Sequence, residues 1–175
     1  MERTLLNQAI ATIKGELVED GNTLALMTDD ELIELDVVSR SRSALPLLTA
    51  GTCVILSGYP RFSPKTKKLR HLTVVACGFC TQRSPGNLSV SGRIFSCGDG
   101  QIVLQVTPKH QPAFFVPVKG FLPNAQENEY WRLECLLKGG LATLTDGKKV
   151  KNAYTAPVLK SRKRKHSKRR EKVAA

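Results

Sequence analysis

The chain has 175 residues, of which 41% are hydrophobic and 24% charged, an ordinary balance for a protein with a packed core. No apolar run approaches the roughly 18 to 20 residues that cross a bilayer, and no apolar signal segment with a small-residue cleavage site opens the chain, so we expect neither a membrane span nor secretion. The 27 basic and 15 acidic residues give a net charge of +12, which makes a polyanion the first partner to consider.

The basic excess lies in two parts of the chain. Residues 1–36 carry two basic and nine acidic side chains, whereas residues 37–98 carry nine basic and no acidic ones. Residues 99–159 are nearly balanced, and residues 160–175 carry nine Lys or Arg against one Glu. The middle stretch is patterned, but the last residues show no apolar periodicity. We therefore expect a basic surface on a folded body, followed by a disordered basic tail.

The first half of the chain has the pattern of short β-strands. Its apolar or alternating stretches are, in chain order, 13–17, 24–26, 32–38, 53–56 and 72–76. In the third of these, Glu34 and Asp36 alternate with apolar residues, which is the period of a half-buried strand. A connection through Pro46 precedes the fourth strand, and residues 43–50 could hold a short helix at most.

The second half follows the same order. Alternating stretches lie at 90–94, 102–104, 113–118 and 132–137. The connection before the last of these contains Pro123, and residues 123–130 are the other place where a short helix could form. A fifth strand could lie at either 141–145 or 150–156.

The two halves align as an internal repeat. The matched residues are Ile13, Gly15, Leu17 and Gly21 against Val90, Gly92, Ile94 and Gly98 at a constant offset of 77, then Leu24 and Leu26 against Ile102 and Leu104 at 78. One extra turn residue explains the change of offset. Self-similarity at a fixed period predicts two copies of one structural unit.

Each unit reads strand, strand, strand, connection, strand, strand. This order resembles the oligonucleotide/oligosaccharide-binding (OB) fold, a five-stranded Greek-key barrel. A glycine in the first strand fits the resemblance, because OB barrels bend that strand at a glycine or bulge. The expected fold is all-β, with OB-like barrels at residues 1–83 and 84–157 and a tail at 158–175. A tandem pair of SH3-like barrels, or one larger sandwich, is the structural alternative.

The densest candidate for binding is residues 58–71. We expect this segment to form the connection between the fourth and fifth strands, which OB folds place at the mouth of the ligand groove. Aromatic rings that stack on bases and cations that follow phosphates suit single-stranded nucleic acid. The candidate residues are Tyr59, Arg61, Phe62, Lys65, Lys67, Lys68 and Arg70, with Arg40 and Arg42 extending the same surface. The alternative is that the rings pack on the barrel and the lysines form a solvated hairpin tip.

The tail supplies a second set of cations. These are Arg162, Lys163, Arg164, Lys165, Lys168, Arg169 and Arg170. Such blocks bind nucleic acid or act as a nuclear address, and the alternative is a tail that only aids solubility. In the second half, Phe114 and Phe115 are adjacent, so one ring of the pair faces outward. That ring is either a stacking platform or an interface filler, and packing is favoured.

The sequence carries little that indicates catalysis or metal binding. Five cysteines without a secretion signal argue against a disulfide framework. Cys77 and Cys80 form a CxxC, but a zinc site needs two further ligands and a redox site needs a helix after the strand. We interpret them as reduced cysteines. The three histidines are scattered and no nucleophile elbow or phosphate loop occurs, so we expect no enzyme, metal or cofactor.

These observations predict an intracellular protein that binds single-stranded or structured nucleic acid, in the cytoplasm of a bacterium or the nucleus of a eukaryote. RNA is favoured over DNA because the small size and cationic tail are typical of RNA-associated proteins, although no residue pattern decides between them. The rival hypothesis is a protein-interaction adaptor within a larger nucleoprotein assembly, whose acidic first strands suit a basic protein surface.

Overall fold

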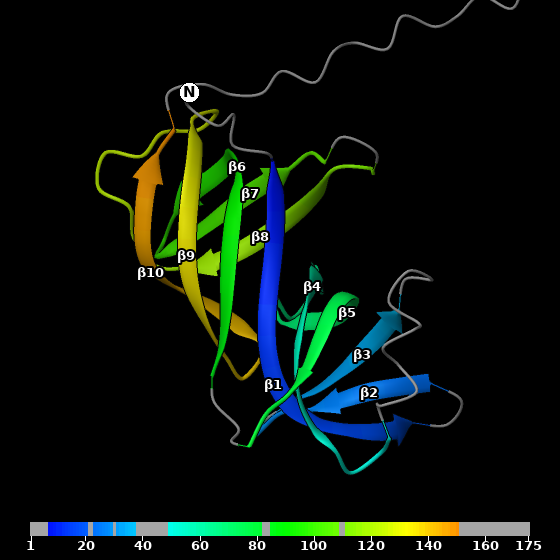
Figure 1. Ribbon diagram of the computed structural model, residues 1–175. Coiled ribbons are helices and arrows are strands. Elements are labelled where there is room, and N and C mark those ends of the chain that lie inside the picture. The colour runs from blue at the N-terminus through cyan, green and yellow to red at the C-terminus, as the bar shows by residue number, and fades with distance from the viewer. Residues whose placement is uncertain are drawn as a thin grey trace, which may run out of the picture.

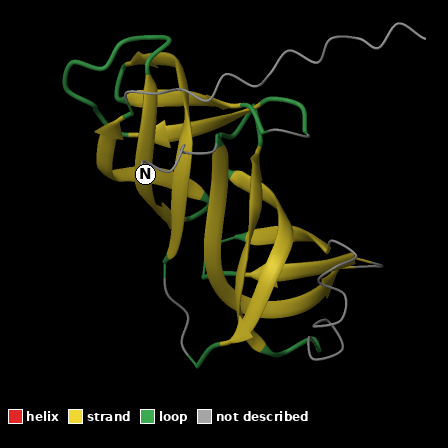
Figure 2. Ribbon diagram, turned by 45° about the horizontal axis from the view of Figure 1, so that its top comes forward, coloured by secondary structure: helices red, strands yellow, loops and turns green. Residues whose placement is uncertain are grey.

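The computed structural model describes residues 7–20, 23–29, 31–37, 49–81, 85–108 and 111–150. All regular secondary structure within these ranges is β-strand, so the described fold is all-β (Figure 1, Figure 2). The strands are β1 (Gln8–Asp20), β2 (Thr23–Met27), β3 (Leu32–Val37), β4 (Cys53–Phe62), β5 (Leu69–Phe79), β6 (Gly86–Gly98), β7 (Gln101–Val106), β8 (Phe114–Lys119), β9 (Tyr130–Lys138) and β10 (Leu141–Lys149). In these ranges, no helix long and apolar enough to cross a membrane occurs.

The first five strands close into a barrel. Their pairing order is β1-β2-β3-β5-β4, and β4 returns to β1. All pairs are antiparallel except β3 with β5, which run parallel. This closed Greek-key order is that of an OB-type barrel and confirms the resemblance for this half of the chain.

The second five strands pair in the same cyclic order. β6 pairs with β7 and β7 with β8, then β8 runs parallel to β10, and β10 pairs with β9, which returns to β6. Leu17 lies opposite Leu26 in the first half, and Ile94 lies opposite Leu104 in the second. The residues that the sequence aligns therefore occupy matching positions.

Glycine is required where the first strand of each half crosses its neighbour. A Cβ atom added at Gly15 would collide with the carbonyl oxygen of Met27, and one added at Gly92 would lie 2.6 Å from the carbonyl oxygen of Gln105. The two glycines are 77 residues apart, and the oxygens that they face are 78 apart. A bare backbone at these points lets each first strand approach its partner and bend around the barrel.

β1 joins the two halves. Its first residues, Gln8 to Thr12, pair antiparallel with Ser91 to Asn87 of β6, and its later residues pair with β4 and β2. Figure 1 shows β1 running from the strands of the second half into the barrel of the first. Burial alternates residue by residue along β1, so one side of the strand faces the interior throughout its length. Buried residues of both halves form one continuous hydrophobic cluster.

The structure corrects two expectations about local elements and locates the last strand. Residues 123–129 form turns and no helix, because Asn124 and Asn128 adopt positive φ values of 60° and 69°, which interrupt a right-handed helix; Tyr130 already begins β9. The fourth strand continues to Phe62, because the alternation of buried and half-buried residues persists past Leu56. Of the two candidates for the last strand, the earlier one forms and extends to Lys149 as β10, whereas residues 151–156 of the later one lie outside the described residues. Most of the helix proposed at 43–50 lies outside the described residues.

The crowding at the glycine of β6 predicts a specific loss of stability. Gly92→Ala forces a methyl group against the Gln105 carbonyl, so the free energy of unfolding should fall by about 1–3 kcal/mol. Gly98→Ala is the matched control, because it lies in the same strand with no atom near its added Cβ. Urea denaturation followed by circular dichroism measures both variants. Equal stability of the two would contradict the close approach.

Candidate functional site

A groove of about 580 Å³ lies where the first barrel meets the outer face of β7 and β8. Its lining comes from the end of β4, the β4–β5 loop, β6, β7 and β8. The lining residues are Arg61, Phe62, Ser63, Pro64, Lys67, Phe95, Ser96, Gln101, Val103, Phe114, Phe115 and Pro117. We call it the aromatic groove, because four of these residues are phenylalanines and none of the described lining residues is acidic.

Strand alternation explains which residues of the second half reach the groove. In β7, Ile102 and Leu104 are buried in the core, so Val103 between them faces outward. β8 places Pro117 opposite Val103 on the same outer face. A register shift between Ile94 and Ser96 disrupts the β6–β7 ladder, as a β-bulge does. Phe95 lies at this irregularity and its side chain is exposed.

Two exposed rings stand together on this face. Phe95 and Phe115 are an edge-to-face pair with ring centroids 4.8 Å apart and an interplanar angle of 63°. They are 54% and 46% exposed, although burying a phenylalanine ring stabilises a protein by about 1.5–3 kcal/mol. An exposed aromatic pair lining a groove is a surface that a flat apolar ligand can cover.

A cation from the first barrel lies over a third ring. The guanidinium carbon of Arg61 is 4.0 Å from the centroid of Phe114, and Nη2 donates a hydrogen bond of 2.9 Å to Oε1 of Gln111. Partial burial lowers the pKa of the Arg61 guanidinium, but arginine stays protonated at neutral pH. The contact therefore holds the positive charge of Arg61, a residue of β4, against β8 in the lining of the aromatic groove.

The equivalent face of the first barrel has the opposite charge. In the first strand of each half, Glu16 pairs with Met27 and Arg93 pairs with Gln105. In the third strand of each half, Glu34 pairs with Ala25 and Pro117 pairs with Val103. By this register, three acidic residues of the first half have counterparts in the second: Glu16 corresponds to Arg93, Glu34 to Pro117 and Asp36 to Lys119. Two of these three positions therefore change from a carboxylate in the first half to a cation in the second.

The structure places the predicted residues in two groups. Arg61, Phe62 and Lys67 line the aromatic groove, whereas Tyr59 and Lys65 do not. Tyr59, Arg61 and Phe62 belong to β4, so the prediction that they lie in a loop is wrong; the loop itself is residues 63–68. Phe62 also packs partly against the hydrophobic cluster, as the packing alternative anticipates.

Two predicted cations are engaged by carboxylates. Lys68 forms an ion pair with Glu31, which precedes β3. Arg70 Nη2 lies 3.6 Å from Glu34 Oε1, and the side chains of both residues are more than half exposed. Exposed pairs of this kind contribute at most about 1 kcal/mol. These cations therefore balance the acidic face of the first barrel, and a phosphate would have to compete with that face for them.

Arg40 and Arg42, and the tail residues Arg162, Lys163, Arg164, Lys165, Lys168, Arg169 and Arg170, lie outside the described residues.

Sequence reasoning missed the residue that completes the exposed ring pair. Strand alternation predicts that one ring of the Phe114–Phe115 pair faces outward and favours packing as its role. In the structure Phe115 is nearly half exposed, and the guanidinium of Arg61 lies over the ring of Phe114. Phe95 carried no local signal, because it lies in an ordinary apolar strand. The repeat itself could have drawn attention to it, since the residue 77 positions earlier is the smaller Val18.

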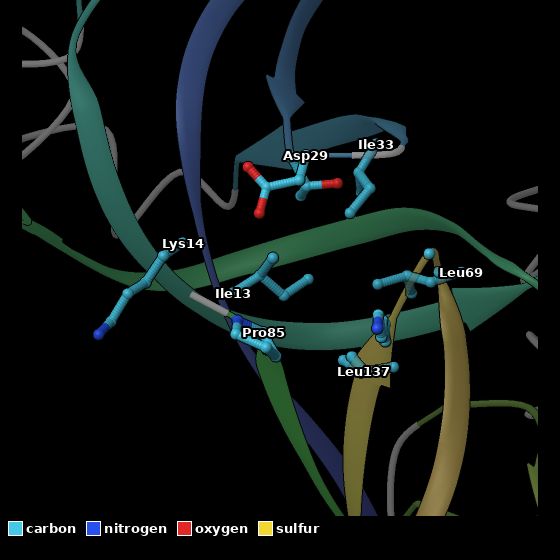
Figure 3. Close-up of a pocket in the computed structure, with 12 residues that line it drawn as sticks. Ile13, Lys14, Asp29, Ile33, Leu69, Pro85 and Leu137 are labelled. Atoms are coloured by element: carbon cyan, nitrogen blue, oxygen red, sulfur yellow. The ribbon is translucent and has the colours of Figure 1, made fainter. Parts of the chain in front are cut away.

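A second, smaller cavity of about 90 Å³ lies at the junction of the halves (Figure 3). The figure shows Ile13, Leu69 and Leu137 around it, with the Lys14 side chain extending away. Leu69 donates its backbone N–H to the carbonyl oxygen of Gly140 here, at 2.7 Å. A volume of this size is far below the roughly 300 Å³ at which small-molecule pockets begin, so we interpret it as a packing defect of the junction.

Potential metal ligands are dispersed in the described part of the chain. No group of three or more His, Cys, Asp or Glu side chains comes together there in a way that could hold a metal ion. The CxxC cysteines do not form a pair of ligands: Cys77 packs against the hydrophobic cluster, and the sulfur of Cys80 lies 2.9 Å from that of Cys53.

Comparison with known proteins identifies the fold. No protein-family model and no curated protein matches the sequence. Among solved structures, the chain is similar to a deletion mutant of the single-stranded DNA binding protein from Thermus aquaticus, with a TM-score of 0.51 and 10% sequence identity. The match covers 83% of this chain and 96% of that chain. At this low sequence identity the similarity concerns the fold alone, and the OB-type strand order described above comes from the strand pairing itself.

Proposed function

We propose that this protein binds single-stranded nucleic acid in the aromatic groove, without a catalytic step of its own. The observation that carries the proposal is the joint presence of four phenylalanines and two cations, with no carboxylate among the described lining residues. Bases stack on the exposed rings, and phosphates contact the cations. The similarity to the Thermus aquaticus protein, which is described as a single-stranded DNA binding protein, supports the same class of ligand.

The position of the groove suits an OB-type ligand site. OB folds bind oligonucleotides over their second and third strands and the adjoining loops. In the second half these strands are β7 and β8, which supply Val103, Phe115 and Pro117 to the groove. We propose that both halves are OB-like barrels and that the first contributes Arg61 and Lys67 to the site of the second. The groove volume of about 580 Å³ falls within the range of roughly 300–1,000 Å³ for ligand sites.

The ligand is single-stranded because its bases must reach the rings. A paired base inside a duplex is stacked on both sides, whereas an unpaired base can lie against Phe95 or Phe115. Ring stacking and phosphate contact do not require a 2′-hydroxyl, so we expect both DNA and RNA to bind in the groove. A preference for RNA, inferred from the cationic tail, stays a prediction, as does a contribution of the tail to affinity.

The adaptor hypothesis is favoured by one observation. The outer face of the first barrel presents Glu34 and Asp36, both exposed, where the second face has Pro117 and Lys119. A basic protein segment would suit that face. Under this hypothesis nucleic acid would bind the tail alone, which the truncation below tests.

The exposed ring pair should carry a large part of the affinity. Each stacked base contributes about 1–3 kcal/mol, so the double variant Phe95→Ala/Phe115→Ala should bind at least about 30-fold more weakly. Fluorescence anisotropy with a labelled oligothymidine and a labelled oligouridine measures Kd for both ligands. Because both side chains are exposed, the variant should keep its fold, which circular dichroism verifies.

Phe121→Ala is the matched control for this variant. Phe121 is 76% exposed but does not line the aromatic groove, so its removal should leave Kd within about twofold. An equal loss in the control, or an unchanged Kd in the double variant, would contradict binding in the groove.

The salt dependence of binding should identify the cation that contacts phosphate. Each phosphate neutralised in a single strand contributes about 0.7 to the slope of log K against log salt. Lys67→Gln should lower the slope by about this amount, because Lys67 lines the groove. Lys65→Gln makes the same charge change in the same loop, away from the groove lining, and should leave the slope unchanged. If both variants lose the same slope, the loop acts only through its overall charge.

Truncation after Leu159 separates the groove from the tail. We expect the shortened chain to bind more weakly at low salt but to keep affinity that Phe95→Ala/Phe115→Ala then removes. The same anisotropy titration measures it. Complete loss of binding on truncation would overturn the groove proposal and favour the adaptor hypothesis.

A further inference from the structure

Two cysteines meet at the open end of the β4–β5 hairpin. Cys53 is the first residue of β4, and Cys80 follows Phe79, the last residue of β5. Val54 lies opposite Phe79, so the antiparallel register brings Cys53 and Cys80 opposite each other. The backbone N–H of Cys80 donates a hydrogen bond of 3.2 Å to the carbonyl oxygen of Cys53, and the two sulfur atoms are 2.9 Å apart.

This pairing does not involve both cysteines of the CxxC, which the sequence predicts to be reduced. Cys77 and Cys80 are three residues apart along an extended segment, which separates their Cα atoms by about 10 Å at about 3.3 Å per residue. A disulfide needs a Cα separation of roughly 4.4–6.8 Å, which opposite residues of an antiparallel pair satisfy. Cys77 lies opposite Leu56 instead and packs against the hydrophobic cluster.

The thiols of Cys53 and Cys80 are also more accessible to solvent than the thiol of Cys135. Cys53 and Cys80 are both partly exposed, so a small oxidant in solution can reach them. Cys135 is buried, and burial raises the pKa of its thiol to about 12, which leaves almost no reactive thiolate at neutral pH.

We propose that Cys53 and Cys80 are a reversible oxidation site, which forms an intramolecular disulfide with a small-molecule disulfide as the oxidant. One thiolate attacks a sulfur of the oxidant, and the mixed disulfide forms as one thiolate leaves. The second cysteine then attacks the protein sulfur and releases the other half of the oxidant. Two protein thiols are oxidised to one S–S bond, and one oxidant disulfide is reduced to two thiols that take up the two protons.

The cross-link would close the hairpin that carries Arg61 and Lys67. Because it joins residues 27 apart in the chain, it restricts the unfolded state and should raise Tm by about 5–10 °C. The bond would form at the end of the hairpin opposite the 63–68 loop. Oxidation of this pair therefore does not depend on whether nucleic acid binds in the aromatic groove, and a binding experiment does not test the oxidation site.

The experiment treats the full chain with oxidised glutathione at pH 8 and identifies cross-links by mass spectrometry of a non-reducing protease digest. We expect a loss of two hydrogen masses, a cross-linked peptide that joins Cys53 to Cys80, and a rise in Tm that dithiothreitol reverses. Cys53→Ser and Cys80→Ser should each abolish the cross-link and the rise. Cys77→Ser is the matched control and should retain both.

Three outcomes would overturn the proposal. These are a cross-link between Cys77 and Cys80, glutathione adducts on separate cysteines with no internal cross-link, and no reaction of the native chain. All three are read on the unmodified sequence, so the result does not depend on whether a serine variant folds.

Discussion

The pairing of β1 with β6 is the constraint on which the rest of the structure depends. A closed barrel has no free edge, but β1 extends past its partner β4, and its residues from Gln8 to Ile10 would be an open edge without β6. Backbone hydrogen bonds hold such strands in one register about 4.8 Å apart. With the halves held in this way, the end of β4 contacts β8 and Arg61 lies over Phe114. The aromatic groove forms at that contact.

The two halves show how one strand arrangement can carry two different surfaces. Their buried positions match, including the glycines where the first strand of each half approaches the second. Their outer faces differ, because Glu16 and Asp36 in the first half are replaced by Arg93 and Lys119 in the second. Core positions are constrained by packing at close to crystal density, whereas outward positions of a strand are constrained only by what touches them. The second face can therefore serve an anion while the first balances the basic loop.

The candidate site was predictable in part. A basic and aromatic segment around Arg61 stands out in the sequence, and the structure brings Arg61, Phe62 and Lys67 into the groove. The local pattern could not show that β4 continues through this segment, because its buried positions include Gly58 and Pro60, which are poor strand signals. The partner rings come from strands more than 30 residues away, and no local pattern places two such segments side by side.

The sequence by itself determined where most strands begin along the chain, and it showed the internal repeat, because apolar alternation, turn residues and glycine spacing are local properties of the chain. It also determined that the body is basic in its middle and acidic at its start. The tertiary structure alone decided which outward rings meet, which cations are engaged by carboxylates, and which cysteine faces Cys53. Each of these depends on cross-strand register and on the contact between the halves, and both are set by long-range backbone pairing that the residues concerned do not encode locally.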